Sequence, residues 1–255
     1  YDTVGIKDVA DTLIEGDKEE KEIEQRETAL CPRHTRNMAE TDMNLKDLRS
    51  MGQITIVSMG DVLSVQCMYE VFIDMIGEHI GKKPKREDLQ RIIADALLAM
   101  TETNSDDVRE TFLAQGKKYM FHQLKLQQKG IRELVMSRDY YLTNIDLFIL
   151  CKHYNMSMVV ISRGKLLETN YRLMSINNTS DTEFFYIVKQ YAIKDNEIQK
   201  YEALQVNSSY QFDIGDMTVK YREELDSHKI ETPFTKQRIK PKRKKKKGKL
   251  VLGEP

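Results

Sequence analysis

Hydrophobic residues in the first half of the chain repeat at three- and four-residue intervals, which is the spacing of amphipathic helices. One such pattern predicts a helix that begins at Cys67 and ends at Gly77 or Gly81. Before it, residues 53–59 form a short β-branched run between glycines, which predicts a buried strand. Residues 41–52 predict another short helix, with a capping residue at its start and a glycine at its end.

Further along the chain, the pattern changes from helices to strands. Two more helices are predicted over residues 86–100 and 105–128, with a break at Gly116. Thr143 and Asp146 have the spacing of a capping box and predict the start of a mostly buried helix. Three apolar, strand-like runs follow, at residues 156–162, 184–191 and 201–206. This order predicts an α/β fold with a mixed sheet flanked by helices.

The composition suits one compact domain with charged ends. The chain has 255 residues, 40% of them apolar, and lacks the long apolar run that spans a membrane. Residues 1–30 carry ten acidic and four basic side chains, whereas residues 236–249 carry ten Lys or Arg and no acid. We therefore predict an acidic, partner-dependent arm over residues 1–41, a globular domain over 42–225 and a basic tail over 226–255.

The cysteines and the ends of the chain suggest an intracellular protein. Three cysteines are too few and too scattered for a disulfide framework, so we expect a reducing compartment and free thiols. No secretory leader opens the chain, and because it begins with Tyr1 we expect a part of a longer polypeptide. Cys31 and His34 lack a second pair of ligands, so no metal site is predicted. Without a glycine-rich phosphate loop, no cofactor is expected either.

Cys67 is the residue with the most interesting chemistry. It is either an inert, buried residue at the start of a core helix or a reactive thiol whose pKa is lowered by the helix N-terminus. A reactive thiol would also need a base to accept its proton. His153, followed by Tyr154 and Asn155, is a candidate base, although a histidine at the end of a helix is also favoured by the helix dipole.

Two segments resemble the two halves of the catalytic centre of ovarian-tumour (OTU) type cysteine proteases, a family of deubiquitinases. Residues 64–69, Ser-Val-Gln-Cys-Met-Tyr, resemble the nucleophile loop, and residues 200–204, Lys-Tyr-Glu-Ala-Leu, resemble the segment that holds the family's histidine. The resemblance covers roughly residues 50–206. It implies an OTU-like, papain-type mixed sheet, with Cys67 at the position of the nucleophile and Lys200 at that of the histidine.

The same segments differ from the family at the positions that carry the chemistry. Ser64 and Val65 stand where the family has Asp and Gly, and a valine hinders the close backbone approach that an oxyanion hole needs. Lys200 is protonated at neutral pH and cannot accept the thiol proton. We therefore predict a pseudoenzyme without catalytic residues, in which Cys67 and Lys200 are vestigial. The alternative is an active deubiquitinase that uses Cys67 with His153 as the base.

Basic residues in the tail predict contact with an acidic partner. The cluster comprises Lys240, Lys242, Arg243, Lys244, Lys245, Lys246 and Lys247. Its charge attracts nucleic-acid phosphate or an acidic protein surface, and because no aromatic residues are interleaved, it is not expected to read bases. It also resembles a nuclear-localisation sequence.

Residues 140–162 resemble segments of divergent domains in large cytoplasmic DNA viruses of the asfarvirus type. This resemblance implies a non-catalytic docking scaffold of a large viral protein in a virion or an RNA polymerase-associated transcription assembly. We accordingly expect other protein subunits as partners, nucleic-acid contact through residues 236–249, and a location in the virion and host cytoplasm, with nuclear entry through the tail. The alternative is a non-specific nucleic-acid-binding protein.

Overall fold

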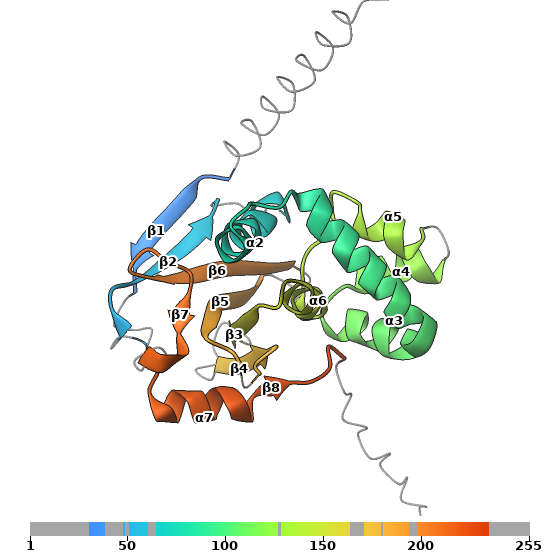
Figure 1. Ribbon diagram of the computed structural model, residues 1–255. Coiled ribbons are helices and arrows are strands. Elements are labelled where there is room, and N and C mark those ends of the chain that lie inside the picture. Colours follow the sequence, from blue (N-terminus) through green and yellow to red (C-terminus); the bar gives the residue numbers. More distant parts are fainter. Residues whose placement is uncertain are drawn as a thin grey trace, which may run out of the picture.

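A mixed sheet forms the centre of the molecule (Figure 1). The computed structural model describes residues 31–38, 48, 51–60, 65–126, 129–163, 171–179, 181–193 and 198–234. Its eight strands are β1 (Arg33–Asn37), β2 (Ile54–Met59), β3 (Ser157–Arg163), β4 (Tyr171–Ile176), β5 (Phe184–Ile193), β6 (Ile198–Val206), β7 (Phe212–Asp213) and β8 (Lys229–Ile230). They follow the order β1-β2-β6-β5-β3-β4-β8, and β7 pairs with β5. Only β3–β5 and β4–β8 are parallel pairs in this sheet. The predicted mixed α/β fold is thus confirmed.

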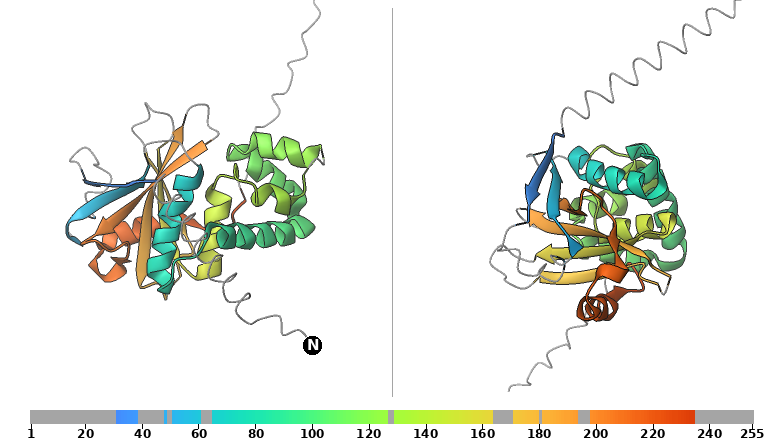
Figure 2. Two further views of the ribbon diagram at one scale, coloured as in Figure 1. Left: turned by 90° about the horizontal axis from the view of Figure 1, so that it is seen from above. Right: turned by 60° about the vertical axis from the view of Figure 1, so that its left-hand side comes forward.

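Helices flank the sheet. They are α2 (Val65–Ile80), α3 (Arg86–Ala114), α4 (Lys118–Lys125), α5 (Ile131–Val135), α6 (Asn144–Tyr154) and α7 (Val219–Ser227). Figure 2 shows the green helices α3, α4 and α5 gathered beside one end of the sheet. Among the described residues, every helix is too short or too polar to cross a lipid bilayer.

Two hydrophobic cores lie on opposite faces of the sheet. Successive side chains of a strand point to opposite faces, so Tyr201 and Ala203 of β6 pack in the core beneath α2, α3 and α6. Leu204 and Val206 of the same strand pack in the smaller core beneath α7. Which core a β6 residue joins therefore shows which face it lies on.

Several helix ends agree with their sequence signals. α2 begins at Val65, two residues before the predicted start, and ends next to Gly81, which adopts a left-handed conformation at φ +74°. The predicted break at Gly116 is also present: this residue has a φ of +88° and lies between the end of α3 and the start of α4. Thr143 and Asp146 form the predicted capping box at the start of α6.

The two helices expected over 86–100 and from residue 105 are confirmed as two halves of α3, which meet at a kink where Asn104 has non-helical angles. Other elements differ from the prediction. The sheet begins at β1, within the range predicted as an arm, because its exposed polar residues join by backbone pairing with β2 and not by hydrophobic alternation. At the other end, α7 and β8 extend past residue 225. The predicted short helix over 41–52 lies mostly outside the described residues.

Candidate functional site at the start of helix α2

Cys67 lies in the first turn of α2, shortly after the end of β2. The turn is fixed by contacts from neighbouring segments. Arg86 donates to Gln66 Oε1 at 2.5 Å and to the carbonyl of Arg138 at 2.8 Å. The same guanidinium lies 4.5 Å from the centroid of the Tyr69 ring, where it makes a cation–π contact. The side chains on both sides of Cys67 therefore serve to hold the helix in place.

The sulfur of Cys67 is bonded to that of Cys31. Their Cα atoms are 5.2 Å apart, within the range that disulfides require, and both residues are buried. The prediction of three free thiols is therefore wrong, and among the described residues Cys151 alone is a free cysteine. The physical reason is strand register: because Arg33 pairs with Met59, the residues before β1 lie beside those that follow β2.

Gly60 gives the disulfide the space it needs. Its N–H donates to the carbonyl of Pro32 at 2.8 Å, which joins the segment before β1 to the end of β2. A Cβ atom at this position would lie 2.9 Å from the Cys67 sulfur, and the φ of Gly60 is +66°. Both the close approach and the left-handed backbone favour glycine here.

Lys200 and Cys67 lie on opposite faces of the sheet. On β6 the residue that faces α2 is Tyr201, whose ring meets Phe72 edge to face at 5.0 Å and whose hydroxyl donates to the carbonyl of Leu142. Lys200 points the other way, on the face where Tyr191 and Glu202 are hydrogen-bonded to each other. The structure thus gives no support to Lys200 as the counterpart of a catalytic histidine.

His153 lies at the opposite end of α2 from Cys67. It is exposed in the last turn of α6, and the carbonyl of the next residue, Tyr154, is hydrogen-bonded to His79 Nε2 at 3.0 Å. His79 follows Cys67 by twelve residues on the same helix, which corresponds to about 18 Å along its axis. This separation excludes the hydrogen bond that a general base must make to the thiol.

His34 also points away from α2. Along β1, Arg33 reaches Gln205, which is on the α2 side of β6, whereas Arg36 reaches Glu202 on the other face. His34 shares the face of Arg36. In the described part of the chain, no group of three or more His, Cys, Asp or Glu side chains is arranged to hold a metal ion.

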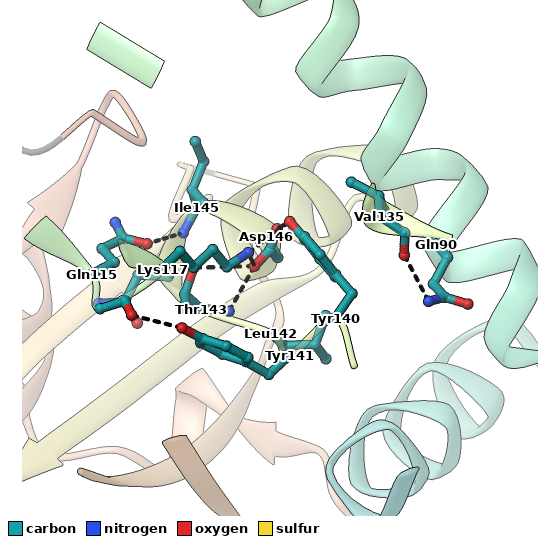
Figure 3. A network of polar contacts seen from close by, with 12 residues as sticks. Gln90, Gln115, Lys117, Val135, Tyr140, Tyr141, Leu142, Thr143, Ile145 and Asp146 are labelled. Atoms are coloured by element: carbon teal, nitrogen blue, oxygen red, sulfur yellow. Dashed lines mark hydrogen bonds and ion pairs between the residues drawn. The ribbon is translucent and has the colours of Figure 1, made fainter. Parts of the chain in front are cut away.

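A buried ionic network lies beneath the capped start of α6 (Figure 3). Lys117 donates to Asp146 Oδ2 at 2.5 Å and to the hydroxyl of Tyr140 at 2.6 Å, and that hydroxyl donates to Asp146 Oδ1. The backbone and hydroxyl of Thr143 donate to the same carboxylate. Neither Lys117 nor Asp146 is exposed at all. The network therefore cannot meet a substrate, and it fixes α6 against the segment that follows α3.

Burial controls the protonation of this network. Desolvation lowers the pKa of Lys117 to about 8, although the neighbouring Asp146 carboxylate opposes the shift. Desolvation raises the pKa of Tyr140 well above its usual value, and the same carboxylate adds to the effect. The spacing of Thr143 and Asp146 predicted their half of the network, but nothing in the sequence around Lys117 indicated that it would be buried against Asp146.

The basic residues of the predicted tail, Lys240, Lys242, Arg243, Lys244, Lys245, Lys246 and Lys247, lie outside the described residues.

Comparisons with known proteins add a distant structural likeness. No protein-family model matches the sequence, and neither does any curated protein. A search of solved structures finds the crystal structure of an OTU deubiquitinase from Wolbachia pipientis wMel, at 14% sequence identity and a TM-score of 0.31. The match covers 62% of this chain and 88% of that one. At this TM-score the likeness identifies no shared function.

Proposed function

We propose that the chain is a non-catalytic domain of OTU-like fold that serves as a docking scaffold within a larger assembly. The observation that carries this proposal is the Cys31–Cys67 disulfide, which occupies the sulfur at the position of the nucleophile. A cysteine protease needs a thiolate and an adjacent base. Here the thiolate is absent, and the two residues considered as its base point away from it or lie at the far end of α2.

A cleavage assay tests whether the domain is catalytically inactive. The full chain, oxidised or treated with a thiol reductant, is incubated with ubiquitin chains of defined linkage, and the products are separated by electrophoresis. We expect no cleavage in either state, because reduction frees the thiol but supplies no base. Cleavage by the reduced chain that Cys67→Ala abolishes and Cys151→Ala leaves intact would establish the deubiquitinase alternative instead.

The scaffold is proposed to contact nucleic acid or an acidic protein through residues 236–249. Ten basic side chains without an acid give this segment a dense positive charge. Neutralising DNA phosphates with such a segment releases counterions, so affinity falls steeply as salt rises. In this proposal the folded body positions the segment, and the charge provides the attraction.

Binding of a short DNA duplex to the full chain over a range of salt concentrations tests this contact. We expect deletion of residues 236–249 to abolish binding and a scrambled segment of the same composition to retain both the affinity and the salt dependence. If the deletion leaves the affinity for DNA unchanged, residues 236–249 do not make the proposed contact. If the scrambled segment fails, recognition depends on sequence and not on charge. The placement in a viral assembly rests on the resemblance of residues 140–162 alone and stays a prediction.

A further inference from the structure

A cavity of about 240 Å³ lies between α7, β8 and the start of β5, far along the chain from Cys67. It is lined by Asn178, Thr179, Phe185, Ile214, Arg222, Leu225, Asp226 and Lys229. Three of these residues are apolar. Phe185 and Leu225 belong to the smaller core, and Ile214 packs against its edge while remaining partly exposed. The cavity therefore has an apolar floor and a polar rim.

The rim carries two cationic side chains, neither of which has a polar partner among the described residues. Arg222 on α7 and Lys229 on β8 form no side-chain hydrogen bond or ion pair within the described part of the chain. Elsewhere on the surface, exposed basic side chains do form such pairs, as Arg91 does with Asp88 and Arg132 with Asp95. Arg222 and Lys229 instead leave their donors available to a molecule in the cavity.

The single carboxylate of the rim is already engaged. Asn178 is buried to 6% exposure, and its Nδ2 donates to Asp226 Oδ1 at 2.7 Å. The C-terminal end of α7 adds a partial negative charge, but Arg222 and Lys229 each carry a full positive charge. The sum over the lining side chains is one net positive charge.

We infer that this cavity is a binding site for a small ligand with an oxyanion group, either phosphate or carboxylate, attached to a compact apolar body. The planar guanidinium of Arg222 suits two parallel hydrogen bonds to such a group, and the ammonium of Lys229 supplies a second positive charge. The apolar body would lie on Phe185, Leu225 and Ile214. A cavity of this size holds a single-ring compound, not a polymer.

Isothermal titration of the full chain with phenyl phosphate, benzoate and benzyl alcohol tests this inference. The first two probes distinguish phosphate from carboxylate, and benzyl alcohol has the ring without the charge. We expect saturable one-to-one binding of at least one anionic probe and none of the alcohol. Arg222→Gln and Lys229→Gln should each weaken binding by about tenfold or more, because each removes a charge-assisted hydrogen bond.

Two matched variants separate this site from general electrostatic attraction. Lys220→Gln removes an exposed charge from the same helix outside the cavity, and we expect its affinity to stay within about twofold of the unmodified chain. Asp226→Asn removes the nearby negative charge and should tighten binding. The basic segment 236–249 also attracts anions, but it is intact in all four variants. Equal affinities across them, or no saturable binding of either anion, would overturn the inference.

Discussion

The ammonium of Lys117 lies 2.5 Å from the carboxylate of Asp146, and both side chains are completely buried. The pair joins the loop after α3 to the first turn of α6, 29 residues further along the chain. Charges so placed lose all their hydration, and each is stabilised only by the other and by the hydroxyls and amides around it. The stability of the helical side of the molecule therefore depends on both partners of this pair being present.

Removing one partner of this pair should strongly destabilise the fold. We expect Lys117→Met to lower the free energy of unfolding by about 3–5 kcal/mol, because it leaves the Asp146 carboxylate buried without its counter-charge. Urea unfolding monitored by circular dichroism measures this change. Arg132→Met is the matched control, since the Arg132–Asp95 pair is exposed and should contribute no more than about 1 kcal/mol. A similar small loss in both variants would contradict the prediction.

Stability should rise with pH through the titration of Lys117. Burial lowers its pKa from 10.5 to about 8 in the folded chain, so above pH 8 the unfolded chain binds more protons than the folded one. The free energy of unfolding then increases with pH, by at most about 1.4 kcal/mol per unit. Above pH 10 the raised pKa of Tyr140 opposes this trend, because its proton is then bound more tightly in the folded state.

Urea unfolding of the unmodified chain and of Lys117→Met between pH 8 and pH 10 measures this dependence. The difference in unfolding free energy between the two should grow with pH. Parallel curves would show that Lys117 titrates at the same pH in the folded and unfolded chains.

The Cys31–Cys67 disulfide should stabilise the fold by restricting the unfolded chain. The bond closes a loop with a sequence separation of 36, for which the loss of unfolded-state entropy corresponds to about 3–4 kcal/mol. A thiol reductant should therefore lower the melting temperature of the unmodified chain. The double variant Cys31→Ser/Cys67→Ser should melt at that lower temperature and show no response to the reductant. An unmodified chain whose melting is insensitive to reduction would contradict this account.

Sequence analysis found the features that depend on neighbouring residues. The β-branched run at β2, the glycine ends of α2 and α3, and the Thr143–Asp146 capping box all follow from spacings of a few residues. β1 and α7 were missed because their residues are mostly polar and are held by pairing or packing with distant elements. Local patterns describe helices and buried strands well, but not edge strands or polar helices.

The candidate site shows even more clearly that local patterns do not specify contacts between distant segments. The Cys31–Cys67 bond depends on the register between β1 and β2, which neither segment specifies alone. The side of the sheet on which Lys200 lies depends on the packing of β6 against α2, and a shift of one residue reverses it. The hydrophobic pattern located Cys67 at the start of a helix, but only the fold shows what surrounds its sulfur.

The pairing of β2 with β6 has a consequence for synthesis of the protein. Ile54 pairs with Val206, so an early strand obtains this neighbour only after the chain has grown by about 150 further residues. At about 5–20 residues per second, the ribosome needs roughly 7–30 s to make them. During this interval the inner edge of β2 has only solvent or a chaperone to bind. Nascent chains that stall in this interval should therefore aggregate more readily than chains released after residue 206.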